Sequence, residues 1–143
     1  MIILDTNVIS ELMARSPAVS VEQWVSLRPP TSLYTTCVTQ AEILFGVRLL
    51  PKGRRRDRVE MAAVTLFDKV FAGRLLAFGS DAARAYARIA AERRRRGKPI
   101  SALDAQIAGI ARAAGAGLAT RNVADFENCG IEVVDPWAGR PAE

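Results

Sequence analysis

Short apolar runs alternate with longer segments of helical periodicity along the whole chain. The expected strands are 1–4, 32–36, 75–78, 118–120 and 132–134, and the expected helices are 6–14, 20–27, 39–50, 54–72, 80–96 and 101–114. Strands separated by helices need crossover connections, which give a mostly parallel sheet with helices on both faces. No linker, repeat or low-complexity segment divides the sequence, so we expect one α/β domain over residues 1–143.

Histidine is absent from the chain, and the two cysteines, Cys37 and Cys129, lie far apart in the sequence. The absence of histidine excludes His-dependent acid–base catalysis, the Ser-His-Asp and Cys-His nucleophile schemes, and His-ligated zinc. We expect both cysteines to be small buried hydrophobic residues. Any catalysis therefore depends on carboxylates, hydroxyls, Lys, Arg or a metal ion held by oxygen ligands.

The positive charge of the chain is concentrated in two arginine-rich runs, and the formal net charge is +5. A basic protein is predisposed to bind polyanions, although each run can also be a solvated helix face or end. The candidate nucleic-acid-binding residues are Arg54, Arg55, Arg56, Arg93, Arg94, Arg95 and Arg96. No signal-peptide pattern or membrane-helix window is present in the sequence, so we expect a cytoplasmic protein that does not contact a membrane.

Acidic and amide side chains stand where a strand gives way to a helix, or where a helix begins. The set is Asp5, Glu42, Asp104, Asn122 and Asp125. Each has a local explanation as a helix cap, since Thr39 with Glu42 and Ser101 with Asp104 have the spacing of a capping box, or nearly so. In a parallel sheet, however, the strand ends gather along one edge, where open α/β sheets bind ligands. Their joint placement therefore indicates one crevice, although strand order alone does not bring Asp104 there.

Several carboxylates in one crevice repel one another. Two unit charges about 4 Å apart cost about 4 kcal/mol at an effective dielectric of about 20, so a cation is expected between them. Oxygen ligands without His or Cys select Mg²⁺ or Mn²⁺. Such an ion can polarise a phosphoryl oxygen, while arginines hold the backbone of a nucleic acid.

Four sequence blocks stand in order over almost the whole chain, at residues 2–11, 39–47, 104–108 and 119–126. Together they resemble the PIN-domain family, and in particular the VapC-type (FitB-like) toxins of bacterial toxin–antitoxin pairs. The resemblance implies a three-layer α/β/α domain with a mostly parallel sheet of about five strands. It also implies a metal-dependent endoribonuclease that uses Mg²⁺ or Mn²⁺, cleaves RNA and is inhibited by a small antitoxin encoded beside it.

The resemblance carries roles over to individual positions. Asp5, Glu42 and Asp104 match the acidic metal-site residues, and Asp125 is a further catalytic candidate. Relatives often have an acid where this chain has Asn122, which contributes no charge, so one firmly held ion is expected rather than two. The implied pocket-supporting residues are Thr6, Asn7, Thr120 and Asn122.

Two kinds of protein contact also follow from the resemblance. In the family an antitoxin side chain, often Arg, enters the acidic pocket, and the toxins are commonly dimers through apolar helical surfaces. The candidate dimer surfaces are residues 82–91 and the region of Ile43, Phe45 and Val47, unless these residues simply pack on the sheet.

Competing functions make different demands on the sequence. A phospho-acceptor signalling domain needs a lysine after a late strand, where none of Lys52, Lys69 and Lys98 stands. A phosphatase with an aspartyl nucleophile needs a second acid two residues after Asp5, where the chain has Asn7. A non-catalytic nucleic-acid-binding module, whose acids only cap helices, stays open as the alternative and predicts RNA binding that EDTA does not affect.

Overall fold

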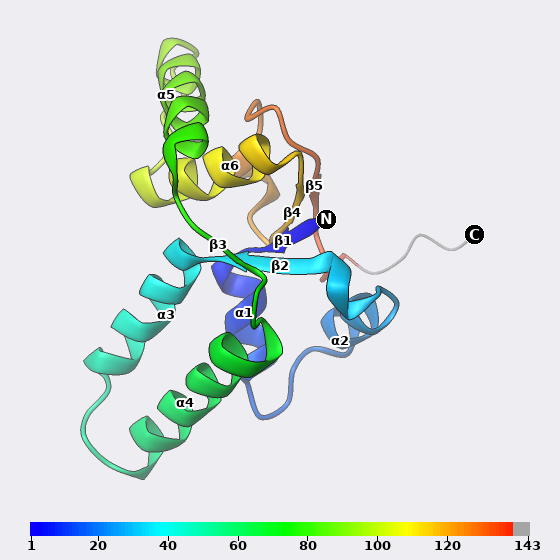
Figure 1. The fold of residues 1–143 in the computed structure, drawn as a ribbon, viewed down its shortest axis with the longest axis vertical. Helices are drawn as coiled ribbons and strands as arrows, with labels where there is room; N and C mark the ends of the chain where they lie inside the picture. Colours follow the sequence, from blue (N-terminus) through cyan, green and yellow to red (C-terminus); the bar gives the residue numbers. More distant parts are fainter. Residues whose placement is uncertain (139–143) are drawn as a thin grey trace.

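A five-stranded parallel sheet lies at the centre of the chain (Figure 1), for which a computed structural model describes residues 1–138. The strands are β1 (Ile2–Leu4), β2 (Leu33–Thr36), β3 (Leu75–Leu76), β4 (Gly117–Ala119) and β5 (Val133–Val134), in the spatial order β3-β2-β1-β4-β5. Every neighbouring pair is parallel, and Ile2 of β1 lies opposite Leu33 of β2 and Gly117 of β4. The predicted parallel sheet of about five strands is confirmed.

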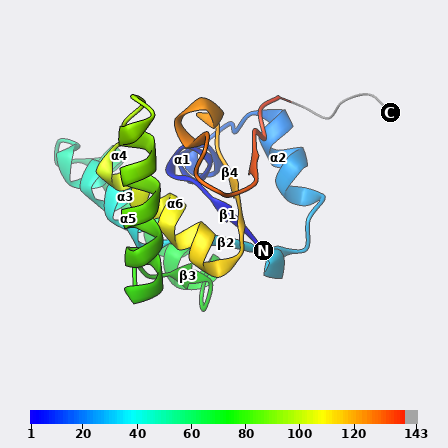
Figure 2. The ribbon, with the colours of Figure 1, turned by 90° about the horizontal axis from the view of Figure 1, so that it is seen from above.

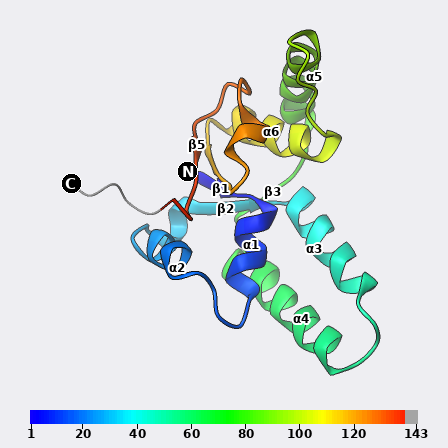
Figure 3. The ribbon, with the colours of Figure 1, turned by 180° about the vertical axis from the view of Figure 1, so that it is seen from behind.

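Helices form a layer on each side of this sheet. They are α1 (Thr6–Met13), α2 (Val19–Ser26), α3 (Cys37–Leu49), α4 (Arg54–Thr65), α5 (Ser80–Arg95) and α6 (Ala102–Ala114). Short helical turns η1 (Pro30–Ser32) and η3 (Val123–Phe126) lie in loops, and the π-helical turn η2 (Leu66–Val70) extends α4. Figures 1 and 3 show α5 and α6 on one side of the sheet and α1 to α4 on the other, as the three-layer prediction requires.

Both faces of β1 are buried, which explains its uninterrupted apolar sequence. Ile3 packs into a core with Leu118 of β4, Ile107 of α6 and Ile89 of α5. Its neighbour Leu4 points to the opposite face, into a second core built largely from α1, α2, α4 and η2. Helix α5 crosses over the outside of α6 (Figure 2) and reaches the sheet mainly through it.

Some helix starts differ from those predicted. Helix α3 begins at Cys37, and its N-cap is Thr36, whose hydroxyl accepts a hydrogen bond from the peptide N–H of Thr39. The predicted capping box of Thr39 and Glu42 is therefore wrong, because the chain already turns into the helix where β2 ends. Gly79 rather than Ser80 is the N-cap of α5, whereas Ser101 caps α6 as predicted.

The structure also decides several predictions of burial. Cys129 is buried as expected, but Cys37, the first residue of α3, is exposed. In the proposed dimer region, Ile43 and Val47 are buried in the chain's own fold and only Phe45 is exposed. No helix among residues 1–138 is long and apolar enough to cross a membrane.

The strand order fixes where a ligand site can form. The chain proceeds from β1 to β2 and β3 on one side of the sheet, and from β4 to β5 on the other. The connections therefore diverge at the carboxyl ends of β1 and β4, which is where open α/β sheets bind ligands. Asp5 follows β1 and Thr120 follows β4 at this switch point.

Candidate acidic active site

Asp5 is the buried centre of the acidic site, with only 4% of its surface exposed. It ends β1 and caps α1, and its Oδ1 accepts a hydrogen bond of 2.8 Å from the peptide N–H of Thr6. Burial raises the pKa of Asp5 from 3.8 to about 6, against the opposing effect of hydrogen bonds from Thr120 and Thr6. The nearby carboxylates of Asp104 and Glu42 raise this pKa further. A carboxyl group with such a pKa changes charge close to neutral pH.

A hydrogen-bond network fixes the orientation of the Asp5 carboxylate. The hydroxyl of Thr120 donates to Oδ2 of Asp5 at 2.7 Å, and accepts from Nδ2 of Asn7 and the peptide N–H of Asn122. The Asn7 side chain is itself held, because its Oδ1 accepts from the peptide N–H of Arg121. These bonds tie the start of α1 to the loop after β4, so Asn7 and Thr120 orient the Asp5 carboxylate within the fold.

Glu42 reaches the site from α3 through the hydroxyl of Thr6. Oγ1 of Thr6 donates to Oε1 of Glu42 at 2.7 Å, and lies 3.0 Å from Oγ1 of Thr39. Since Thr6 has a single hydroxyl proton, the Thr39 hydroxyl donates to Thr6. A chain of donors therefore runs from Thr39 through Thr6 to Glu42, and it holds the half-buried carboxylate of Glu42 beside the start of α1.

Asp104 and Asp125 form the outer part of the acidic site. Asp104 lies in the first turn of α6, where the Ser101 cap accepts from its peptide N–H, and Asp125 is exposed in η3. The pKa of Asp104 is raised, chiefly by burial and also by the negative charge of Asp125. The hydrogen bond with Ser101 and the positive charge of Arg93 oppose this rise. Asn122 occupies the N-cap position of η3, as predicted, but its side chain makes no capping hydrogen bond there.

The fold thus brings the four predicted acids into one electrostatically coupled group. Asp5 is influenced by Glu42 and Asp104, and Asp104 by Asp125. Within residues 1–138, however, no three acidic, Cys or His side chains lie close enough together to bind one metal ion. The oxygen donors of the group are nevertheless of the kind that Mg²⁺ binds, and Mg²⁺ keeps several of its water molecules and usually binds only one or two carboxylates directly. A divalent cation at this group would therefore be held largely through its water molecules.

The two arginine-rich runs occupy different environments. The first run begins α4, and the second ends α5, where Arg94, Arg95 and Arg96 are exposed. Arg95 and Arg96 both form ion pairs with Glu92. Arg93 is buried, with 5% of its surface exposed, so its predicted contact with nucleic acid is wrong. It belongs to the interior stripe of α5 rather than to the basic surface.

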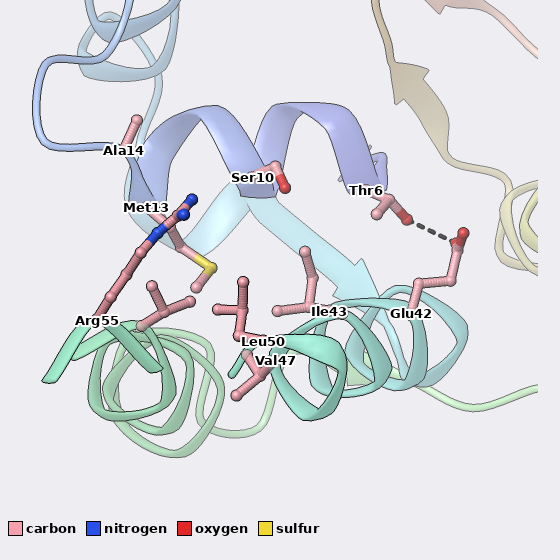
Figure 4. Close-up of a pocket in the computed structure, with 11 residues that line it drawn as sticks. Thr6, Ser10, Met13, Ala14, Glu42, Ile43, Val47, Leu50 and Arg55 are labelled. Carbon is pink, nitrogen blue, oxygen red and sulfur yellow. Dashed lines mark hydrogen bonds between the residues drawn. The ribbon is translucent and has the colours of Figure 1, made fainter. Parts of the chain in front are cut away.

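A groove of about 440 Å³ adjoins the acidic site between α1, α3 and the start of α4 (Figure 4). Thr6 and Glu42 lie at one end, joined by their hydrogen bond, and Arg55 lies at the other end (Figure 4). Apolar side chains such as Met13, Ile43 and Val47 line the part between them. The groove therefore offers an acidic end and an apolar wall to the same ligand.

Sequence reasoning missed three features of the site. The hydroxyl of Thr39 acts on Glu42 through Thr6, which no pattern indicates because Thr6 and Thr39 are far apart in the sequence. The guanidinium of Arg121, the residue that follows Thr120 in the sequence, lies 5.0 Å from the ring centre of Trp137. The interior position of Arg93 did have a signal, because Ala82, Tyr86, Ile89 and Arg93 follow helical spacing.

Comparison with known proteins gives a consistent result. Residues 2–130 match the family described as PIN domain. Over 137 residues the chain is 39% identical to a VapC ribonuclease of Sinorhizobium fredii, covering 96% of this chain and 98% of the relative. It is 36% identical over 141 residues to Toxin FitB of Neisseria gonorrhoeae, covering 96% and 99% respectively.

Solved structures resemble the chain over its full length. In a structure of FitAB bound to a DNA fragment, one chain superposes with a TM-score of 0.92 at 33% sequence identity, covering 100% of both chains.

Proposed function

Because the chain belongs to the PIN-domain family, we propose that it is a metal-dependent endoribonuclease and the toxin of a toxin–antitoxin pair. The observation that carries this proposal is the buried Asp5, coupled to Glu42 and Asp104 at the switch point of a parallel sheet. Relatives named as a VapC ribonuclease and as a toxin support it. No histidine is present to offer another acid–base scheme.

The proposed cofactor is Mg²⁺ or Mn²⁺, held by Asp5, Glu42 and Asp104 directly or through water. When bound, the ion supplies a Lewis acid that neutralises the scissile phosphate and acidifies the attacking water. Above a pH of about 6, Asp5 is ionised and can act as a ligand. Thr120 and Asn7 keep the Asp5 carboxylate in one orientation, and Thr6 does the same for Glu42. Asp125 adds negative charge beside Asp104.

The proposed RNA-binding residues flank this centre. Arg54, Arg55 and Arg56 begin α4, and Arg55 lines the groove that leads to Glu42. Arg94, Arg95 and Arg96 form the second exposed group at the end of α5. Arginines bind phosphate oxygens without reading the sequence, so these residues fit a substrate chosen mainly by its backbone and shape.

The proposed partner is a small antitoxin that occupies the groove and presents a basic side chain to the acids. The groove is mostly apolar, as a partner helix requires, and it ends at Thr6 and Glu42 beside Asp5. A guanidinium placed there would replace the cation and leave the carboxylates paired. Association of the toxin with a second copy of itself remains a further prediction, for which exposed Phe45 is the available apolar candidate.

The nuclease proposal is tested by incubating the purified chain with structured and unstructured RNAs in Mg²⁺ or Mn²⁺, with and without EDTA. We expect cleavage that EDTA abolishes and that Asp5→Asn and Asp104→Asn each reduce by at least about 100-fold, as for loss of a strong electrostatic contribution. Asp81→Asn is the matched control, because Asp81 also begins a helix but lies beside Ala113 and Ala114, at the far end of α6 from Asp104.

Two results would contradict the proposal. Intact RNA under all these conditions, with binding that EDTA leaves unchanged, would favour the non-catalytic nucleic-acid-binding module. Cleavage that survives both acid substitutions would place the chemistry elsewhere or in a contaminant. The toxin role is tested separately, since expression should arrest growth and a small protein encoded by the neighbouring gene should relieve the arrest.

A further inference from the structure

Arg93 is a buried cation in the last turn of α5. It continues the interior stripe of Ala82 and Ile89, whereas Arg94, the next residue, is exposed. Moving a guanidinium out of water is unfavourable unless its N–H groups are paired. The hydrogen-bond partners of the Arg93 side chain therefore have to explain why it is buried.

The Arg93 guanidinium is bonded to backbone carbonyl groups from two separate segments. Its Nε donates to the carbonyl oxygen of Lys98 at 2.7 Å, and Nη1 donates to those of Asp125 at 2.8 Å and Glu127 at 3.0 Å. The peptide N–H of Lys98 returns a bond of 3.0 Å to the Arg93 carbonyl oxygen. Nη1 also lies 3.7 Å from Sγ of the buried Cys129.

These two segments are the ones that present the outer acids. Lys98 lies in the turn that leads into the Ser101 cap and the first turn of α6, where Asp104 stands. Asp125 lies in η3, and its own backbone carbonyl is one of the acceptors. A single side chain thus fastens both acid-bearing segments to the end of α5.

The charge of Arg93 has no carboxylate at ion-pair distance within residues 1–138. Its positive charge nevertheless acts on Asp104 and lowers the pKa of that carboxyl group, opposing the effects of burial and of Asp125. The arginine therefore offsets part of the effect of Asp125 on Asp104, while its hydrogen bonds hold the backbone of Asp125 and of the turn that precedes α6.

We propose that Arg93 is a positioning residue for the cleavage reaction, which holds Asp104 and Asp125 at a fixed separation through the backbone of their two segments. This inference rests on the proposed nuclease function. Arg93 is buried and does not meet RNA, so its loss should lower kcat and leave the KM for RNA unchanged. Arg88 is exposed on the same helix and belongs to neither proposed RNA-binding group, so its loss should change neither kcat nor KM.

The test compares Arg93→Lys with the control Arg88→Lys, which makes the same exchange at an exposed position of α5. Lysine keeps the positive charge at position 93. Its single ammonium group, however, lacks the planar fork of donors by which the guanidinium binds carbonyl groups of both segments at once. We expect Arg93→Lys to lower kcat at least about tenfold with KM unchanged, whereas Arg88→Lys keeps both kcat and KM. Amide hydrogen exchange in residues 122–129 should accelerate at least about tenfold in Arg93→Lys, while the interior of α6 is unchanged.

A second variant guards against misfolding. Arg93→Gln buries no charge and can keep one carbonyl bond, and it should show the same loss of kcat and the same local exchange. Unchanged exchange in residues 122–129, or faster exchange with full kcat, would overturn the proposal. Uniformly faster exchange along the chain, or unfolding of both variants, would show that Arg93 only stabilises the fold, and this result would also overturn the proposal. A wild-type chain that cleaves no RNA would refute the nuclease function, and the exchange data would still report on the contact itself.

Discussion

Replacing Asp5 by asparagine should abolish activity and, at neutral pH, stabilise the fold. The wild-type carboxyl group has a pKa of about 6 instead of 3.8, chiefly because it is buried. Below pH 3.8 the group is protonated in the folded and unfolded chains alike. Between these two values only the folded chain retains the proton, so stability falls as the pH rises, and the full cost is present above a pH of about 6.

The size of this cost follows from the difference between the two pKa values. One pKa unit corresponds to about 1.36 kcal/mol, which gives roughly 3 kcal/mol of lost stability at neutral pH. Asparagine avoids the charge, and its oxygen can still accept from the peptide N–H of Thr6. Its amide group faces the Thr120 hydroxyl, which already accepts hydrogen bonds from Asn7 and Asn122 and loses the acceptor for its own proton. This loss offsets part of the gain, so we expect a net stabilisation of about 1–2 kcal/mol.

The assay is thermal or denaturant unfolding in EDTA, so that no divalent ion compensates the carboxylates. Near pH 7.5, Asp5→Asn should raise Tm by roughly 5 °C, given about 2–4 °C per kcal/mol for a chain of this size. Near pH 4, where the folded wild-type group is protonated, the two proteins should differ by less than about 1 kcal/mol. Asp81→Asn, at an exposed ion pair with Arg84, should change stability by less than about 1 kcal/mol at both values.

An Asp5→Asn chain that is no more stable than the wild type near neutral pH would refute this reasoning. An equal gain at both pH values would also refute it, because a packing effect does not depend on the proton. Activity retained by the stabilised variant would remove Asp5 from the catalytic site altogether.

Two further variants test single contacts in the structure. Thr120→Val keeps the side-chain shape but removes the donor to Asp5 and the acceptor for Asn7, so cleavage should slow by about 10–100-fold, whereas an unchanged rate would show that the network is not needed. At Gly109, where α5 and α6 approach, an added Cβ would lie 2.7 Å from the carbonyl oxygen of Ala82, so Gly109→Ala should lower the free energy of unfolding by about 1–3 kcal/mol. Gly46→Ala, with nothing within 4 Å of the added Cβ, should instead be neutral or stabilising, and equal losses in both would contradict the close approach.

The inner part of the site was predictable because local pattern and topology agree there. The apolar run 1–4 predicts a buried strand, and a parallel sheet carries the residue after it to the ligand-binding edge. Asp5 could therefore be predicted as a site residue without any knowledge of tertiary contacts. Asp104 is different, because it begins a helix that follows a helix, and its place in the crevice depends on how α6 packs on the sheet.

The remaining differences between the predicted and the observed site arise where the same type of residue can play either of two structural roles. Thr36 and Thr39 can both cap a helix, and the extended backbone at the end of β2 decides for Thr36, which frees the Thr39 hydroxyl to donate to Thr6. The four arginines at positions 93–96 are alike in charge, and charge alone assigns all of them to the surface. Helical spacing from Ile89 separates Arg93 from its neighbours, so periodicity is the better guide within a run of like charges.

The two parts of the acidic site differ in how firmly the fold holds them, and this bears on the number of ions. Asp5 receives hydrogen bonds from Thr6, Asn7 and Thr120, whereas Asp125 is exposed and its backbone carbonyl is held by Arg93. Asn122 contributes no charge. We therefore expect one tightly bound ion per chain, measured by titration calorimetry with Mn²⁺, and Asp125→Asn should weaken its binding several-fold without changing that stoichiometry. A stoichiometry of two that falls to one in Asp125→Asn would instead place a second ion in the outer part of the site.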